Sequence, residues 1–214
     1  MNKLTTTLLC LLVFLLNINS QNMHMAELFK QMPDSLMPYL TTNNKLDMLD
    51  FIDAGMEAKV TNKFDGESIL CELDSTYLRL KLNTSVEVEM KLLSSSNLLN
   101  DSTKHLICIV TTYGDLIKES VLKLFTSKWN SIAHDITKSK LISYVIHKPD
   151  TMSELTYNDV KNIPDDYLIT LSLDKNENSM SVSASTTLLS TDDSTKVKPI
   201  ISTKRLLWNG KTFK

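Results

Sequence analysis

The stretch Tyr77–Leu92 constrains the fold most, because its apolar residues alternate with polar ones on both sides of a short polar turn. With the turn at Asn83-Thr84-Ser85, the pairs are Leu82 with Val86, Lys81 with Glu87, Leu80 with Val88, Arg79 with Glu89 and Leu78 with Met90. One face of this hairpin is apolar, and the other carries two pairs of opposite charge worth roughly 0.2–1 kcal/mol each. A slip of one residue would turn every Leu and Val to water, so the pattern predicts this register.

Two further stretches have β patterns. In the second predicted hairpin, Tyr167, Ile169, Leu171 and Leu173 face Met180, Val182, Ala184 and Thr186, and Ser181, Ser183 and Ser185 line the other face. Leu106–Val110 is apolar at every position, which is typical of a central strand buried on both faces.

Helical signals are confined to the segment before Met56. Met25–Met32 is a short amphipathic stretch ended by Pro33, and Thr42 or Asn43 is expected to cap a second helix that ends near Gly55. The predicted fold is therefore α+β, mainly an antiparallel β meander of about eight strands, with short N-terminal helices packed on it.

The N-terminus carries the pattern of a signal peptide. Lys3 precedes an apolar stretch, Leu4–Leu16, which is too short to span a bilayer core of about 30 Å. We therefore expect residues 1–20 to be cleaved and residues 21–214 to form a single α+β domain, with a division into two β-rich halves near 94–104 left open. The expected location is the periplasm or the cell surface, with no transmembrane segment after cleavage.

Composition excludes several classes of function. With 23 Lys+Arg against 25 Asp+Glu, the formal net charge is −2, which argues against a nucleic-acid partner. Phosphate-binding loops need closely spaced glycines, and the chain has only four. The four histidines are scattered, without the spacing of a zinc site. No cofactor site, metal site or catalytic residue is predicted.

Two cysteines, Cys71 and Cys108, remain after residues 1–20 are removed. Export to an oxidising compartment allows a disulfide between them. The alternative is that each is a free cysteine that packs as a small hydrophobic residue.

Acidic clusters suggest two sites, each with a simpler interpretation. Asp47, Asp50 and Asp53 form a helical stripe, which we interpret as the solvated face opposite the apolar residues rather than a carboxylate or cation site. The loop Asp174–Ser179 resembles the start of a calcium loop but lacks its glycine and its final acid, so an ordinary hairpin loop is expected.

Five Asp-Ser or Asp-Thr steps resemble the O-glycosylation acceptor motif of exported proteins in the Bacteroides group. The acceptor hydroxyls would be Ser35, Ser75, Ser102, Thr151 and Ser194, all in expected turns or loops. The alternative is that Asp-Ser and Asp-Thr are simply favoured at turns and helix caps.

Four segments are similar to a family of secreted proteins of unknown function from Bacteroidales. They are Phe29-Lys-Gln-Met-Pro-Asp-Ser, Asn44-Lys-Leu-Asp-Met-Leu-Asp-Phe-Ile-Asp-Ala, Thr111-Thr-Tyr-Gly114 continuing through Glu119-Ser120 to Trp129-Asn130, and Trp208-Asn-Gly-Lys. The resemblance implies export and an envelope location. It transfers no catalytic residue.

The preferred hypothesis is an exported, non-enzymatic cell-envelope protein that binds another protein or a glycan. One alternative is a secreted hydrolase whose site combines Asp47, Asp50 or Asp115 with a histidine, His105 being the first to test against Asp115. A second alternative is a secreted hydrolase inhibitor that uses the loop Asp174–Ser179.

Overall fold

The computed structural model describes residues 24–95 and 105–214 of the chain. Two helices open the fold, α2 (Met25–Gln31) and α3 (Thr42–Asp53), with the 3-10 helix η1 (Asp34–Leu36) between them. Seven strands follow: β1 (Ala58–Thr61), β2 (Glu67–Leu73), β3 (Tyr77–Asn83), β4 (Val86–Ser94), β5 (His105–Tyr113), β6 (Glu119–Thr126) and β7 (Ser131–Ile132). The remainder comprises α4 (Lys138–Val145), α5 (Glu154–Lys161), β8 (Leu168–Leu173), β9 (Ser179–Ser185), α6 (Thr191–Val197), η2 (Lys198–Ile200) and β10 (Lys204–Leu207).

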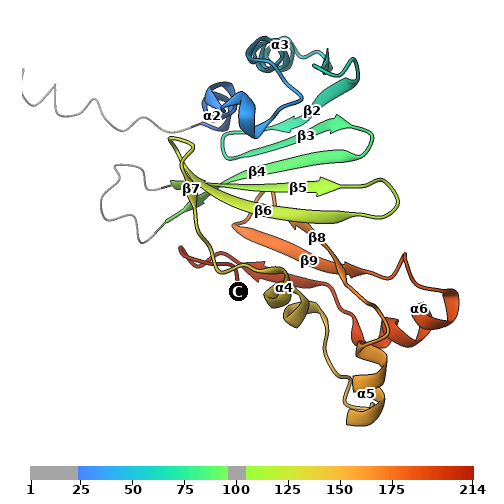
Figure 1. Cartoon of the computed structure of the whole chain (residues 1–214). Helices are drawn as coiled ribbons and strands as arrows, with labels where there is room; N and C mark the ends of the chain where they lie inside the picture. Colours follow the sequence, from blue (N-terminus) through green and yellow to red (C-terminus); the bar gives the residue numbers. More distant parts are fainter. Residues whose placement is uncertain (1–23, 96–104) are drawn as a thin grey trace, which may run out of the picture.

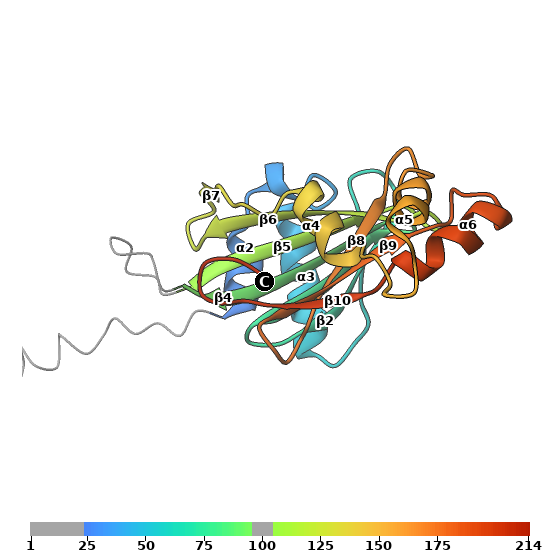
Figure 2. The same cartoon turned by 90° about the horizontal axis from the view of Figure 1, so that it is seen from below.

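The strands form two antiparallel sheets. The large sheet has the order β1-β2-β3-β4-β5-β6-β7, which is also the order along the chain, and the small sheet has the order β10-β9-β8. Helices α2 and α3 lie on one side of the large sheet, and the small sheet and α4 lie on the other (Figure 1). The view from below shows β8, β9 and β10 crossing the large sheet obliquely (Figure 2).

The large sheet separates two apolar cores. On one face Leu78, Leu80 and Met90 pack against helix residues such as Phe29. On the other face Cys108 and the neighbouring residues of β5 and β6 pack against the small sheet and α4. Because β5 contributes to both cores, Leu106–Val110 is buried at every position, as its sequence predicts.

The first predicted hairpin is confirmed in four of its pairs. Lys81 lies opposite Glu87, Leu80 opposite Val88, Arg79 opposite Glu89 and Leu78 opposite Met90. The predicted pair of Leu82 with Val86 is wrong, because the register shifts next to the turn and Asn83 lies opposite Val86.

The second hairpin also has the predicted register, with Leu173 opposite Met180, Leu171 opposite Val182 and Ile169 opposite Ala184. The predicted α+β class and the N-terminal helices are confirmed. Two points differ: the described residues form two sheets rather than one meander, and α3 is capped by Thr41, whose side chain accepts from the backbone N–H of Asn44. No described helix has the length and apolar character needed to cross a membrane.

Candidate functional site

The turn between β5 and β6 is built around Gly114. Its φ is +101°, and a Cβ at this position would lie 1.8 Å from the carbonyl oxygen of Ile117. Only glycine fits such a conformation and such a close approach. The turn therefore has a fixed shape, and the residues that follow Gly114 project from it.

Exposed apolar side chains are concentrated on this β5–β6 hairpin. Nine large hydrophobic side chains are exposed in the described part of the chain, and four of them, Tyr113, Leu116, Ile117 and Val121, lie within nine residues of one another; we call these four the hairpin patch. Leu116 is 86% exposed, the largest fraction among the nine. Concentrations of exposed apolar side chains mark interaction sites in many soluble proteins.

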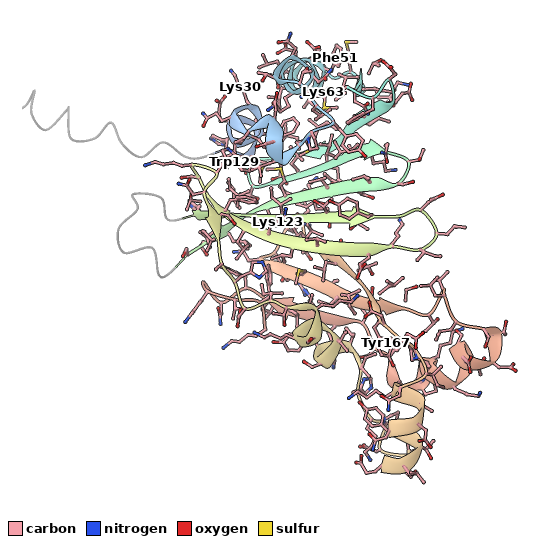
Figure 3. The ribbon with its side chains drawn as sticks, in the orientation of Figure 1. Lys30, Phe51, Lys63, Lys123, Trp129 and Tyr167 are labelled. Carbon is pink, nitrogen blue, oxygen red and sulfur yellow. The ribbon has the colours of Figure 1, made fainter. Side chains whose placement is uncertain are left out.

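A hollow of about 300 Å³, lined by both polar and apolar residues, adjoins the hairpin patch at Tyr113 and Val121 on the helix-facing side of β5 and β6. Its lining comprises Ser35, Leu36, Ile109, Thr111, Tyr113, Val121, Lys123 and Phe125. Lys123 lies on β6 over the large sheet (Figure 3). The floor of the hollow is buried core, whereas its rim is polar.

The opposite face of the same hairpin borders a polar groove, which we call the inter-sheet groove. Successive residues of a strand point to opposite faces, so Thr112 faces this groove while Thr111 and Tyr113 face the hollow on the helix side. The groove consists of two hollows of about 490 and 230 Å³ that share Glu87, Thr112 and Lys118. Its other lining residues are Glu67, Ile69, Lys81, Asn83, Thr84, Ser85, Val86, Gly114, Asp115, Glu89, Thr170, Leu171, Ser172, Ser181 and Ser183.

Glu89 is the buried carboxylate of the inter-sheet groove, with 9% of the residue exposed. Its Oε1 accepts from the Tyr77 hydroxyl at 2.8 Å and from Ser172 Oγ at 3.2 Å, and its Oε2 accepts from the Leu173 backbone N–H at 3.0 Å. Burial raises the pKa of Glu89, while these three hydrogen bonds act in the opposite direction. Glu89 thus joins β4 of the large sheet to β8 of the small sheet.

Lys91 makes a second buried link two residues along β4. It is 3% exposed, and its Nζ donates to the backbone oxygen of Lys175 and to Thr76 Oγ1. Burial lowers the pKa of Lys91. Alternation alone would leave the polar face of the first hairpin open to solvent. In the structure, the loop between β8 and β9 covers part of that face.

Arg79 organises the charges on the neighbouring strands. Its guanidinium bonds Glu72 Oε1 at 2.8 Å and Glu87 Oε1 at 3.2 Å, and Lys175 Nζ lies 3.2 Å from Glu72 Oε2. The hydrogen bond from Arg79 is the main cause of the lowered pKa of Glu72. Arg79 was expected to pair with Glu89 directly across the hairpin, but it pairs diagonally with Glu87 and with the adjacent strand.

The structure does not bring together the acids and histidine suggested for a hydrolase. Asp47, Asp50 and Asp53 are exposed on α3. His105 begins β5 and Asp115 lies beyond its end, so about 30 Å of extended strand separates them. No group of three His, Cys, Asp or Glu side chains in the described segments is arranged to hold a metal ion.

Cys71 and Cys108 are both free, so the disulfide that the sequence allows is not formed. They lie on β2 and β5, with β3 and β4 between them, a separation of about 14 Å at the usual spacing of strands. A disulfide requires Cα atoms within about 7 Å. Cys108 is fully buried and packs in the apolar core, and this burial raises the pKa of its thiol.

Four of the five candidate glycosylation residues lie in the described part of the chain. Ser35, Ser75 and Thr151 are exposed in η1 or in turns. Ser194 is half-buried within α6 and donates to Thr186 Oγ1 at 3.0 Å, so the expectation of a loop is wrong there. Ser102 lies outside the described residues.

The loop Asp174–Ser179 is a hairpin turn closed by its own side chains. Asp174 Oδ1 accepts from the backbone N–H groups of Asn176 and Glu177 at 2.8 and 2.9 Å. Arg205 of β10 forms ion pairs with Asp174 and Glu177. The local chemistry is therefore that of a charged turn tied to the small sheet.

Comparison with known proteins identifies the class to which this fold and surface belong. A family model described as "Protein of unknown function (DUF3256)" matches residues 15–213, and the chain belongs to this family. No match was found among curated proteins. The resemblance to a family of unknown function is confirmed, whereas export, which that resemblance also implies, stays a prediction.

Among solved structures, the chain is similar to a domain of an uncharacterized protein from Porphyromonas gingivalis W83. The TM-score is 0.70 at 20% sequence identity, and the match covers 89% of this chain and 96% of the other. At this identity the likeness concerns the fold alone.

Proposed function

We propose that this protein is exported to the cell envelope, in the periplasm or at the cell surface, and acts there as a non-enzymatic binding protein whose partner is another protein. Export is supported by the apolar stretch Leu4–Leu16 behind Lys3. The observation that carries the binding function is the hairpin patch, where four of the nine exposed large hydrophobic side chains of the described residues lie within nine positions of one another beside a hollow.

The chemistry of the patch favours a protein partner. Its side chains are mainly aliphatic, and Lys118 and Lys123 flank them as exposed cations without an ion pair in the described part of the chain. Surface charges choose and orient partners more than they add affinity. The partner is accordingly a protein with an apolar segment bordered by Asp or Glu.

Binding is preferred to hydrolysis because the carboxylates of the inter-sheet groove already have strong partners. Glu87 is paired with Arg79, and Glu89 accepts three hydrogen bonds. A general acid or base needs a carboxyl group within reach of a substrate proton. Both groups serve instead to hold the strands and sheets together.

Affinity capture from an envelope extract tests the proposal. The bait is the tagged exported protein, compared with a Leu116→Ser/Ile117→Ser double variant and with Leu188→Ser as the matched control. Leu188 is 64% exposed, but it lies in the turn before α6, away from the hairpin patch.

The same partner should be recovered with the unmodified bait and with Leu188→Ser, and at least about tenfold less with the double variant, since losing two buried aliphatic contacts costs more than about 1.4 kcal/mol. Recovery should also fall as salt is raised, because Lys118 and Lys123 steer the partner. Equal recovery by all three baits would contradict the proposed surface.

A further inference from the structure

We propose that the inter-sheet groove is a second binding site, separate from the hairpin patch, and that it takes a neutral saccharide. The larger of its two hollows, about 490 Å³, falls in the usual size range of small-molecule sites, and the smaller, about 230 Å³, adjoins it through Glu87, Thr112 and Lys118. Walls from both sheets meet along the smaller hollow, with Glu87 and Thr112 on one side and Thr170 and Ser181 on the other. The larger hollow is lined by strands and turns of the large sheet.

Five of the eight polar residues around the smaller hollow carry hydroxyl groups, as do seven of the fourteen along the whole groove. The seven are Thr84, Ser85, Thr112, Thr170, Ser172, Ser181 and Ser183. Part of this set is already ordered: Thr170 and Ser183 bond across the small sheet at 2.7 Å, and Thr112 bonds Ser120 at 2.8 Å. Hydroxyls both donate and accept, so an ordered row of them matches a ligand that is itself a row of hydroxyls.

The charges of the groove favour a neutral ligand. Glu67 is paired with Lys59 at 2.8 Å, and Glu87 is paired with Arg79. The lining groups left without an ion pair in the described segments are Lys81 and Lys118 against Asp115 and Glu89, two of each sign. The two carboxyl groups would repel an anion, and the two lysines would repel a cation. A neutral sugar hydroxyl can donate a hydrogen bond to the carboxyl groups and accept one from the lysines.

Glu89 gives the site a rigid acceptor. It is more than nine-tenths buried, three donors fix its orientation, and it lines the groove. An ionised carboxylate has about four acceptor positions, so one remains after Tyr77, Ser172 and Leu173 have bonded. That position is on Oε2, which receives only the Leu173 N–H among these three donors.

The test measures binding of maltotriose, cellotriose, chitotriose and mannotriose to the purified protein by saturation-transfer NMR and calorimetry. Ser181→Leu fills the groove from β9. Ser185→Leu is the matched control, because Ser185 lies on the same strand and the same face but outside the lining. Both substitutions are made at partly or fully exposed positions, and unfolding curves establish that both variants fold.

We expect at least one of the four trisaccharides to bind with a Kd near or below about 1 mM, Ser181→Leu to weaken it about tenfold or more, and Ser185→Leu to change it by less than about twofold. The Leu116→Ser/Ile117→Ser variant should keep this binding, which separates the groove from the hairpin patch. Absence of binding by all four, or equal binding by both serine variants, would overturn the proposal. Binding of acetate or of lysine at the groove in place of every neutral sugar would overturn the ligand class.

Discussion

Glu89 of β4 accepts a hydrogen bond at 3.0 Å from the backbone N–H of Leu173, a residue 84 positions later in the chain. This contact ties β8 to β4 of the large sheet beside the inter-sheet groove, which Glu89 lines. It joins two hairpins whose sequences each satisfy their own register, so the arrangement of the two sheets depends on a few polar contacts as well as on the apolar core.

Replacing Glu89 with Gln should destabilise the protein by about 1–3 kcal/mol at pH 7. The amide keeps the size of the side chain but places an N–H₂ donor among the Tyr77, Ser172 and Leu173 donors. Urea unfolding followed by circular dichroism measures the change. Glu57→Gln, at an exposed position before β1, is the control, and equal unfolding free energies for the two variants would show that Glu89 does not hold the sheets together.

The destabilisation caused by Glu89→Gln should depend on pH. Because burial raises the pKa of Glu89, the folded protein binds this proton more tightly than the unfolded chain, and the stability contributed by Glu89 falls as pH rises from 4.5 through the folded pKa. The difference in unfolding free energy between the unmodified protein and Glu89→Gln should be largest below pH 4.5 and shrink as pH rises. Carboxyl groups with lowered pKa values, such as Glu72, act in the opposite sense but are common to both proteins. A difference that stays constant or grows with pH contradicts this assignment.

Gly114→Ala should cost at least about 2 kcal/mol of stability and abolish partner capture. The new Cβ would be strained by its φ and would also collide with the Ile117 carbonyl oxygen, so the turn that presents Leu116 and Ile117 must rearrange. Gly55→Ala is the comparison, because Gly55 has a φ of +68° but nothing within 4 Å of an added Cβ. Its cost should be about 1 kcal/mol, from backbone strain alone. Similar losses in thermal unfolding for both variants would mean that the collision is relieved without cost.

Native alkylation should distinguish Cys71 from Cys108. Cys71 is half-buried, whereas Cys108 is fully buried with a raised thiol pKa, so iodoacetamide should modify Cys71 first and Cys108 only after unfolding. Peptide mass spectrometry reads both sites. If neither thiol reacts in denaturant until a reductant is added, the two are bridged and the strand order of the large sheet is wrong.

The sequence predicts the local structure of the sheets well, because register follows from alternation. Leu80 and Val88, or Leu171 and Val182, are paired as their apolar patterns require. The predicted pair of Leu82 with Val86 is wrong because the register shifts by a bulge next to the turn, and the hydrophobic pattern gives no sign of that bulge.

The helices after β7 were missed for a different reason. Helices α4, α5 and α6 have seven or eight residues, too few for a clear apolar period. Their Ser or Thr caps, at Thr137, Ser153 and Ser190, were the available signals.

The candidate site could not be predicted, because it depends on contacts between distant segments. Alternation places Glu89 and Lys91 on a polar face, and nothing near them in the sequence indicates that the β8–β9 hairpin will cover that face. The hairpin patch had a local signal in the apolar pair Leu116-Ile117 next to Gly114, although only the structure shows that no helix covers it.

The large sheet has the same strand order in space as along the chain. Apart from the longer connection between β4 and β5, its strands reach their partners through short loops, so loop-closure entropy is low and the meander is expected to form early in folding. The small sheet must then find its place against residues more than 80 positions earlier, as the contact of Glu89 with Leu173 illustrates. The smaller hollow of the inter-sheet groove, which both sheets line, is therefore complete only once the small sheet has docked, and an agent that fills it would act on a protein whose β1–β6 meander is already formed.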